Sequence, residues 1–258
     1  MDDIKYQLAD CCKQLKLSSG LAERAMTMQG DSHQEYLVQL LTKELEYRRK
    51  RRVTTLTNAA KFPRRYKLEN FRADEIDFQG DSTLAGLLRL DFLHSGKNVV
   101  MYGSTGTGKT MLSILIGMEA CRQNIPVRFF RAASLVNQLA EQHVAGTLSS
   151  FKKKLSKIQI LIIDEFGYIP YDKTGAQLLF DYLSEIHENK FVILNTNLEF
   201  SQWGNILYDY KMATALIVRL THHVELVLFP GGNNRLRESS INDRIKQITA
   251  SGKDSHPA

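Results

Sequence analysis

Apolar residues recur at helical spacing in the first quarter of the chain. They fall at Ile4, Leu8, Cys11, Cys12 and Leu15, and again at Leu37, Leu40, Leu41 and Leu45. Side chains three and four residues apart share one face of a helix, so the pattern predicts helices over residues 1–60. Ser32 and Glu35 have the spacing of a capping box, which predicts the start of the longer helix. Pro63 predicts that this helix has ended before that residue.

After residue 75, short apolar runs alternate with helical patterns. The runs predict strands over residues 98–102, 127–130, 158–163, 191–194 and 224–229, and the intervening patterns predict helices over 109–122, 134–143, 175–189 and 212–222. Continuous apolar strands separated by helices are typical of a parallel sheet covered on both faces. We therefore expect an α/β domain preceded by a small all-helical domain.

Composition is that of an ordinary globular protein, with 258 residues, 43% hydrophobic and 24% charged. No run approaches the ~18 consecutive apolar residues that a membrane helix needs, and the N-terminus, MDDIKYQLAD, lacks the apolar segment of a secretory signal. Three cysteines give neither a disulfide framework nor metal-ligand spacing. We expect a cytoplasmic protein without a membrane partner.

The net charge of +6 is unevenly distributed along the chain. Residues 1–67 carry 14 Lys and Arg against eight acidic residues, so residues 68–258 have no net charge. This asymmetry indicates two modules with different roles. We predict a basic helical domain and linker over 1–67, the α/β domain over 68–250, and a disordered tail over 251–258.

One glycine-rich segment follows a predicted strand and precedes a predicted helix. It reads Gly103, Ser104, Thr105, Gly106, Thr107, Gly108, Lys109 and Thr110, which fits the P-loop pattern G-x-x-x-x-G-K-[ST]. In such a loop the backbone N–H groups surround a phosphate chain, and the helix dipole favours the anion. Lys109 is expected to reach the β- and γ-phosphates of ATP, and the Thr110 hydroxyl to bind Mg²⁺.

Two acidic residues follow the most apolar predicted strand. We expect Asp164 to hold Mg²⁺ and its water, and Glu165 to act as general base on the attacking water. A phosphotransferase that protects its phosphoryl group from water has little use for such a base. The adjacent pair therefore favours an ATPase.

Two further positions are open to more than one interpretation. Asn195, Thr196 and Asn197 end a buried strand, where a polar side chain either positions the attacking water or forms a simple turn. Arg219 lies in an otherwise apolar helical segment. It either extends from the edge of the core toward solvent or serves as an arginine finger given to a neighbouring subunit.

The order of these motifs resembles the IstB-type ATPases, AAA+ helper proteins of insertion-sequence transposition, which are similar to DnaC-type helicase loaders. The resemblance spans about residues 30–240 and rests on LLTKELEYRRKRR, GSTGTGKT, RFFRAASLVNQL, ILIIDEFGYIPYD, LNTNLEFSQWGNILYD, ALIVRLTHH and GGNNRLR. It implies a P-loop fold of AAA+ type and Mg²⁺-dependent ATP hydrolysis.

The resemblance also implies roles for individual residues. Asn197 holds the last position of the family's T-S-N tripeptide and would be the sensor-1 residue, although Asn195 stands where the family has threonine. Arg219 would be the arginine finger. Family members lack the helical lid of other AAA+ proteins, so a sensor-2 role for Arg235 or Arg237 stays open. Tyr66 and Phe71 are weaker candidates for the walls of an adenine pocket.

Two basic clusters indicate contact with a nucleic-acid backbone. One comprises Arg48, Arg49, Lys50, Arg51 and Arg52, and the other Lys152, Lys153 and Lys154. The resemblance implies a helix at the second cluster that tracks DNA. Each cluster by itself is equally compatible with a solvated face, and contacts of this kind give affinity without sequence specificity.

The resulting hypothesis is an ATP-dependent helper that oligomerises on duplex DNA as a ring or helical filament, selects target DNA, and recruits or activates a transposase. The main alternative is a DnaC-type loader of a replicative helicase. From other classes, a small-molecule phosphotransferase and a nucleotide-gated scaffold are further alternatives, and the Asp164–Glu165 pair argues against the phosphotransferase.

Overall fold

The computed structural model describes residues 2–168 and 171–232. Contacts divide the chain into two compact units, residues 1–56 and 57–258. Arg235, Arg237 and the tail predicted at 251–258 lie outside the described residues.

Three helices build the first unit: α1 (Asp2–Gln14), α2 (Leu21–Thr27) and α3 (His33–Ala60), the last of which continues into the second unit. Its small core consists of Cys12, Leu21, Ala22 and Leu40. The predicted capping box is confirmed in part, because the Glu35 N–H donates to Ser32 Oγ at 3.1 Å.

The second unit alternates strands and helices, as predicted. Its strands are β1 (Asp77–Phe78), β2 (Asn98–Gly103), β3 (Val127–Arg131), β4 (Ile160–Phe166), β5 (Phe191–Thr196) and β6 (Val224–Phe229). Its helices are α4 (Leu84–Arg89), α5 (Asp91–His94), α6 (Lys109–Arg122), α7 (Ala132–Val144), α8 (Leu148–Leu155), α9 (Lys173–Ile186), α10 (Trp203–Leu207) and α11 (Tyr210–Thr221), with short 3-10 turns η1 (Leu68–Asn70) and η2 (Phe200–Gln202).

The six strands form one sheet in the order β1-β6-β2-β5-β4-β3. The five longer strands are parallel. The two-residue β1 pairs antiparallel with β6 and was not predicted, because two residues carry no periodicity. The carboxyl ends of β2, β4 and β5 therefore meet at one edge of the sheet.

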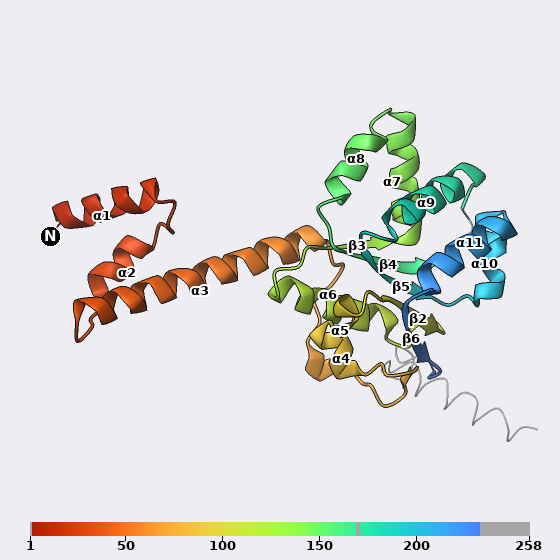
Figure 1. The fold of residues 1–258 in the computed structure, drawn as a ribbon, viewed down its shortest axis with the longest axis horizontal. Helices are drawn as coiled ribbons and strands as arrows, with labels where there is room; N and C mark the ends of the chain where they lie inside the picture. Colours follow the sequence, from red (N-terminus) through yellow and green to blue (C-terminus); the bar gives the residue numbers. More distant parts are fainter. Residues whose placement is uncertain (1, 169–170, 233–258) are drawn as a thin grey trace, which may run out of the picture. The chain divides into compact units, whose positions relative to one another are not determined.

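Helices cover both faces of this sheet (Figure 1). Helix α6 packs against one face, where it contacts β2, β3, β4 and β5. The largest apolar core lies on the other face, between the sheet and α7, α9, α10 and α11. This arrangement fixes the loop between β2 and α6 at the edge where β4 and β5 end.

No helix in the described part of the chain is long and apolar enough to cross a membrane.

Candidate functional site

The glycine-rich loop connects β2 to α6, as the sequence predicts. Gly106 and Gly108 have φ angles of 83° and 109°, which side-chain-bearing residues rarely adopt. A side chain at Gly103 would overlap the carbonyl oxygen of Phe229 on β6. Glycine is thus required both for the curvature of the loop and for its close approach to the neighbouring strand.

Lys109 begins α6 with its ammonium group held over the loop. Its Nζ donates to the carbonyl oxygens of Gly103 and Ser104, both at 2.6 Å. Thr107 Oγ1 also donates to the Ser104 carbonyl, at 2.8 Å. The loop is therefore curled around the lysine, with a positive charge where phosphate oxygens would lie.

Thr110 and Asp164 lie side by side although 54 residues separate them. Thr110 Oγ1 is 3.0 and 2.9 Å from Asp164 Oδ1 and Oδ2. Asp164 is only 4% exposed. Asn195 Nδ2 donates to Asp164 Oδ1 at 2.8 Å and to Ser113 Oγ at 2.9 Å. The start of α6 and the ends of β4 and β5 thus meet at the buried carboxylate of Asp164.

A β-bulge separates Asp164 from Phe166. Ile163 pairs with Leu194 but Phe166 pairs with Thr196, so β4 carries one extra residue there. The backbone of Glu165, at this bulge, is left-handed, with a φ angle of 57°.

The bulge determines where three successive side chains lie. Asp164 faces α6, whereas Phe166 lies on the opposite face, with its ring 4.5 Å from that of the buried Trp203. Strict alternation would have placed both on the same face. The side chain of Glu165, between them, remains 49% exposed beside the carboxylate of Asp164.

Arg131, at the end of β3, is a site residue that the sequence reasoning missed. Its Nε lies 3.5 Å from Glu165 Oε2, and its Cα lies opposite Asp164 in the register of β3 and β4. No local pattern in the sequence indicates Arg131, because its place beside the acidic strand depends on the order of strands in the sheet. Ser113, one helical turn after Thr110, was missed as well.

The two asparagines at the end of β5 have different surroundings. Asn195 is 1% exposed and contacts Asp164, and its Oδ1 is buried without a hydrogen-bond partner among the described residues. Asn197 is exposed and lies one residue beyond Thr196, which is opposite Tyr102. The sensor role of Asn197 stays a prediction.

Arg219 lies far from the loop of its own chain. It lines a cavity of about 490 Å³ together with Asn98, the first residue of β2. Because β2 rises ~3.3 Å per residue, Asn98 and Gly103 are about 17 Å apart. The Arg219 guanidinium stacks over Phe180 at 5.4 Å, and its buried Nη1 has no hydrogen-bond partner among the described residues.

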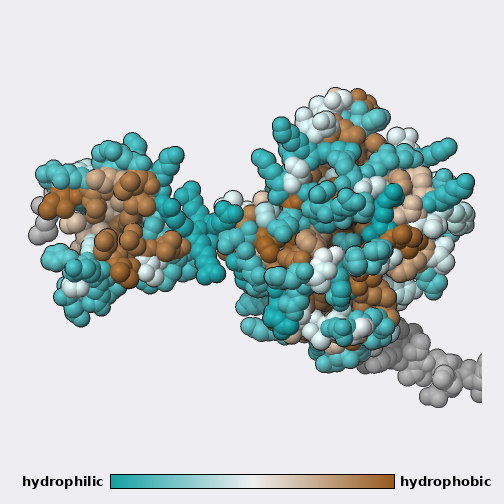
Figure 2. Space-filling model, in the orientation of Figure 1, coloured by the Kyte–Doolittle hydropathy of each residue, from teal (hydrophilic) through white to brown (hydrophobic). Residues whose placement is uncertain are grey.

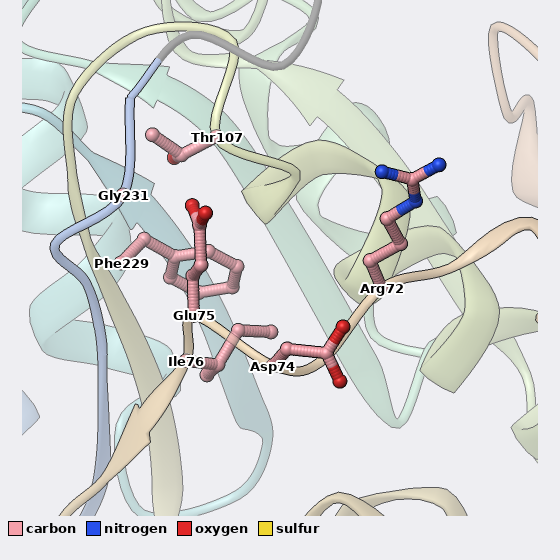
Figure 3. A pocket seen from close by; sticks show the side chains of 7 residues that line it. All are labelled: Arg72, Asp74, Glu75, Ile76, Thr107, Phe229 and Gly231. Carbon is pink, nitrogen blue, oxygen red and sulfur yellow. The ribbon is translucent and has the colours of Figure 1, made fainter.

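A small pocket of about 80 Å³ adjoins the glycine-rich loop (Figure 3). It is lined by Arg72, Asp74, Glu75, Ile76, Thr107, Phe229 and Gly231. Glu75 points toward Thr107, with the Phe229 ring beside it. A side chain at Gly108 would meet Phe71 at 3.6 Å, whereas Tyr66 does not line the pocket.

The loop after Glu165 is anchored by a buried tyrosine. The Gly167 N–H donates to the Tyr171 hydroxyl at 3.4 Å. Burial raises the pKa of Tyr171 to about 12, so this anchor is neutral at any physiological pH.

In each basic cluster, one side chain has an intramolecular carboxylate partner and the others are exposed. Lys152 pairs with Glu185 at 2.5 Å on α9, whereas Lys153 and Lys154 are exposed on α8. In the first unit Arg48 is bound to Glu44 at 2.8 Å and to the Lys16 carbonyl at 2.6 Å. The side chains of residues 49–52 are exposed on α3.

The sequence matches the model of the IstB-like ATP binding proteins over residues 11–242. The chain belongs to this family. It is 33% identical to an ATP-binding protein of insertion sequence IS5376 from Geobacillus stearothermophilus, with 93% of this chain and 98% of that protein covered. It is 31% identical to the IS21 ATP-binding protein of Pseudomonas aeruginosa over 80% of this chain and 78% of that protein. This IstB-like protein is an ATPase of AAA+ type that binds ATP.

Solved structures show the same fold. The AMPPCP-bound DnaA of Aquifex aeolicus superposes with a TM-score of 0.53 at 20% identity, and covers 73% of this chain. This IstB-like protein spans 57% of that DnaA chain. DnaI superposes with a TM-score of 0.50 at 19% identity, over 66% of this chain and 90% of DnaI.

Proposed function

We propose that this IstB-like protein uses ATP to assemble on duplex DNA, select a target, and recruit or activate a transposase. The observation that carries the ATP-dependent part of the proposal is the convergence of Thr110, Asp164 and Asn195 beside Glu165. Relatives of this chain are ATP-binding proteins of insertion sequences, and each of the two units carries an exposed basic segment.

The glycine-rich loop holds the phosphates in this proposal. Its backbone N–H groups and the Lys109 ammonium neutralise the polyphosphate, and the start of α6 adds its dipole. The Thr110 hydroxyl and the Asp164 carboxylate, which lie within 3.0 Å of each other, offer the oxygen ligands that Mg²⁺ prefers. Bound there, Mg²⁺ would neutralise charge on the phosphates.

Glu165 activates the attacking water in this proposal. Its carboxylate lies next to Asp164 at the edge of the sheet, where it can accept a proton from an attacking water. Asn195 fixes the orientation of Asp164 through its 2.8 Å hydrogen bond. Asn197, one position past the strand end, is proposed to contact the γ-phosphate side as the sensor.

Arg219 completes the site of a neighbouring subunit rather than its own. The length of β2 keeps it from the loop of its own chain, and its Nη1 has no hydrogen-bond partner among the described residues, so this nitrogen is not committed to an anion of its own chain. Subunits would then associate head to tail as a ring or a helical filament.

DNA contacts are assigned to the exposed members of the two clusters, residues 49–52 on α3 and Lys153 and Lys154 on α8. Arg48 and Lys152 have intramolecular carboxylate partners, so they contribute less. We also propose a basic module over 1–67, an ATPase module over 68–250 and a cytoplasmic location. The helicase loader remains the alternative.

The test compares two variants at the same site by fluorescence anisotropy on labelled duplex DNA. Lys109→Ala should lose ATP-dependent assembly, whereas Glu165→Gln should bind ATP and DNA but fail to turn over, which traps the assembly. Hydrolysis at the wild-type rate in Glu165→Gln would overturn the base assignment. Binding to a replicative helicase but not to a transposase would favour the loader.

A further inference from the structure

Four residues of the second unit, Thr110, Ser113, Asp164 and Asn195, form a closed ring of hydrogen bonds. Ser113 follows Thr110 by one turn of α6, and its hydroxyl donates to the Thr110 carbonyl at 3.0 Å. Asn195 Nδ2 donates to Ser113 Oγ at 2.9 Å and to Asp164 Oδ1 at 2.8 Å. The Thr110 hydroxyl, 2.9 Å from Asp164 Oδ2, closes the ring. The ring thus joins the start of α6 to the ends of β4 and β5.

The inner part of this ring is shut off from solvent. Hydrophilic residues cover much of the visible face of the second unit, where water solvates them (Figure 2). Ser113 and Asn195, by contrast, are 0% and 1% exposed. A buried polar group that loses its hydrogen bond pays the full cost of its desolvation. Each hydrogen bond of the ring therefore restrains the two residues that it joins.

The donors and acceptors of the ring fix the orientation of the Asn195 amide. A carboxylate only accepts hydrogen bonds, so the amide nitrogen of Asn195 must face Asp164. The Ser113 hydroxyl has a single proton, which it donates to Thr110, and it therefore accepts from Asn195. Turning the amide over would break both hydrogen bonds of its nitrogen. Asparagine also meets a requirement that serine or threonine could not, because a hydroxyl cannot donate to two acceptors at once.

The ring distinguishes the two carboxylate oxygens of Asp164. Oδ1 accepts from Asn195 and lies 3.0 Å from the Thr110 hydroxyl. Among the described residues, Oδ2 has the Thr110 hydroxyl as its one partner. A hydroxyl that donates its proton to a carboxylate keeps its oxygen lone pairs for a cation. Asn195 thus holds one oxygen of Asp164 and leaves the other beside the Thr110 oxygen.

We infer that Ser113 is a positioning residue for Mg²⁺, which acts through Asn195 on the carboxylate of Asp164. This inference rests on the proposal that Thr110 and Asp164 hold the ion. Ser113 fixes the Asn195 amide, and the amide fixes Oδ1 of Asp164. Residues that hydrogen-bond to a metal ligand orient that ligand and change metal affinity. Mg²⁺ is sensitive to such orientation, because it requires near-ideal octahedral geometry.

Mg²⁺ titrations of the full chain with AMPPCP, an ATP analogue that is not hydrolysed, test the inference. Calorimetry at a series of MgCl₂ concentrations gives the half-effect concentration, at which half of the full increase in AMPPCP affinity is reached. Ser113→Ala should raise this concentration about twofold to tenfold, the worth of one hydrogen bond. Asn195→Ala should raise it about tenfold to a hundredfold.

Ser184→Ala is the matched control. It removes a buried hydroxyl of α9 that has no hydrogen-bond partner among the described residues, and it should leave the half-effect concentration unchanged. Ser113→Cys, of similar size and a weak hydrogen-bonding partner, replaces Ser113→Ala if that variant does not fold, and the same increase is expected. A wild-type half-effect concentration in the Ser113 variant would overturn the inference.

A double variant tests whether Ser113 acts through Asn195. If it does, adding Ser113→Ala to Asn195→Ala should change the half-effect concentration by less than about twofold, because the interaction is already lost. The same factor in both backgrounds would show that Ser113 acts independently of Asn195 and would overturn the inference.

Asp164→Asn separates this inference from the proposed function. Loss of the Mg²⁺ effect in Asp164→Asn, with no change in Ser113→Ala, would overturn the inference and leave the proposed Mg²⁺ site intact. A wild-type Mg²⁺ effect in Asp164→Asn would overturn both. The readout is equilibrium binding, so it depends neither on hydrolysis nor on DNA.

Discussion

Glu44 is a buried carboxylate that stabilises the first unit. Burial by itself would raise its pKa, but hydrogen bonds from the Ser18 hydroxyl, Arg48 and the Ser18 N–H outweigh that effect and lower the pKa. A carboxylate with a lowered pKa in the folded state contributes stability above its unfolded pKa, and this contribution is lost as the pH falls through the folded value.

Glu44→Gln should therefore cost about 2 kcal/mol of stability at pH 7 and much less at pH 3. Thermal unfolding followed by circular dichroism at both pH values measures the difference. Glu46→Gln, which removes an exposed ion pair to Lys43 at 3.2 Å, is the control and should change little. Equal destabilisation at pH 3 and pH 7 would contradict the charged role of Glu44.

Arg131 restrains the proposed base. Its 3.5 Å ion pair with Glu165 holds the carboxylate toward β3. Arg131→Ala should free the carboxylate and raise basal ATP hydrolysis about twofold to fivefold, the range of a partly exposed ion pair. Steady-state phosphate release measures the rate, and Arg122→Ala, which breaks an exposed pair with Glu119, serves as the control. A lower rate would mean that Arg131 assists turnover.

At the scale of elements, apolar periodicity predicted most of the second unit. The helix predicted over 109–122 and the strand predicted over 224–229 match α6 and β6 at both ends, because their apolar runs are flanked by the glycine-rich loop and by polar residues. The predicted helix at 175–189 became α9, Lys173–Ile186, because Asp172 caps it by accepting from the Gly175 N–H at 3.2 Å.

The parts of the site that could not be predicted depend on pairing between strands. The motifs indicated Lys109, Thr110, Asp164 and Glu165 as a group, and the structure brings them to one edge of the sheet. The bulge at Glu165 follows from the register of β4 against β5, which no local pattern contains. The Arg131–Glu165 ion pair follows from the order of strands for the same reason.

Helix α8 offers two available lysines rather than three. Lys153 and Lys154 are exposed, and Lys152 is paired with Glu185. If α8 contacts DNA, Lys153→Ala with Lys154→Ala should flatten the salt dependence of binding by about 1.8 units, at ~0.9 per phosphate. Lys152→Ala should add little. Anisotropy titrations over a range of KCl concentrations give the slope.

Loss of charge alone must be separated from loss of contact in that experiment. Lys173→Ala with Lys211→Ala removes two exposed lysines from α9 and α11 and is the matched control. A slope that falls equally in both double variants would show general attraction to DNA, and a slope that changes in neither would exclude α8 from the contact.

At the scale of the whole molecule, the position of Arg219 predicts shared active sites. Arg219→Ala and Lys109→Ala should each abolish hydrolysis, with a loss of about a thousandfold or more for the arginine. A mixture of the two should regain activity, because one kind of interface keeps both an intact loop and an intact arginine. Phosphate release against protein concentration should rise more than linearly in the wild type. Activity that is first order in protein, with no recovery in the mixture, would place the complete site within one chain.

The left-handed backbone conformation of Glu165 lowers the thermal stability of the protein at the residue that turnover requires. A glutamate in this conformation costs about 1–2 kcal/mol, whereas asparagine tolerates it. Glu165→Asn should therefore melt about 2–4 °C above Glu165→Gln for each kcal/mol relieved, in a domain of this size. Differential scanning calorimetry of the two inactive variants isolates the backbone effect, and equal melting temperatures would contradict it. Selection for thermostability at this one position would favour a protein that keeps its fold and loses its base.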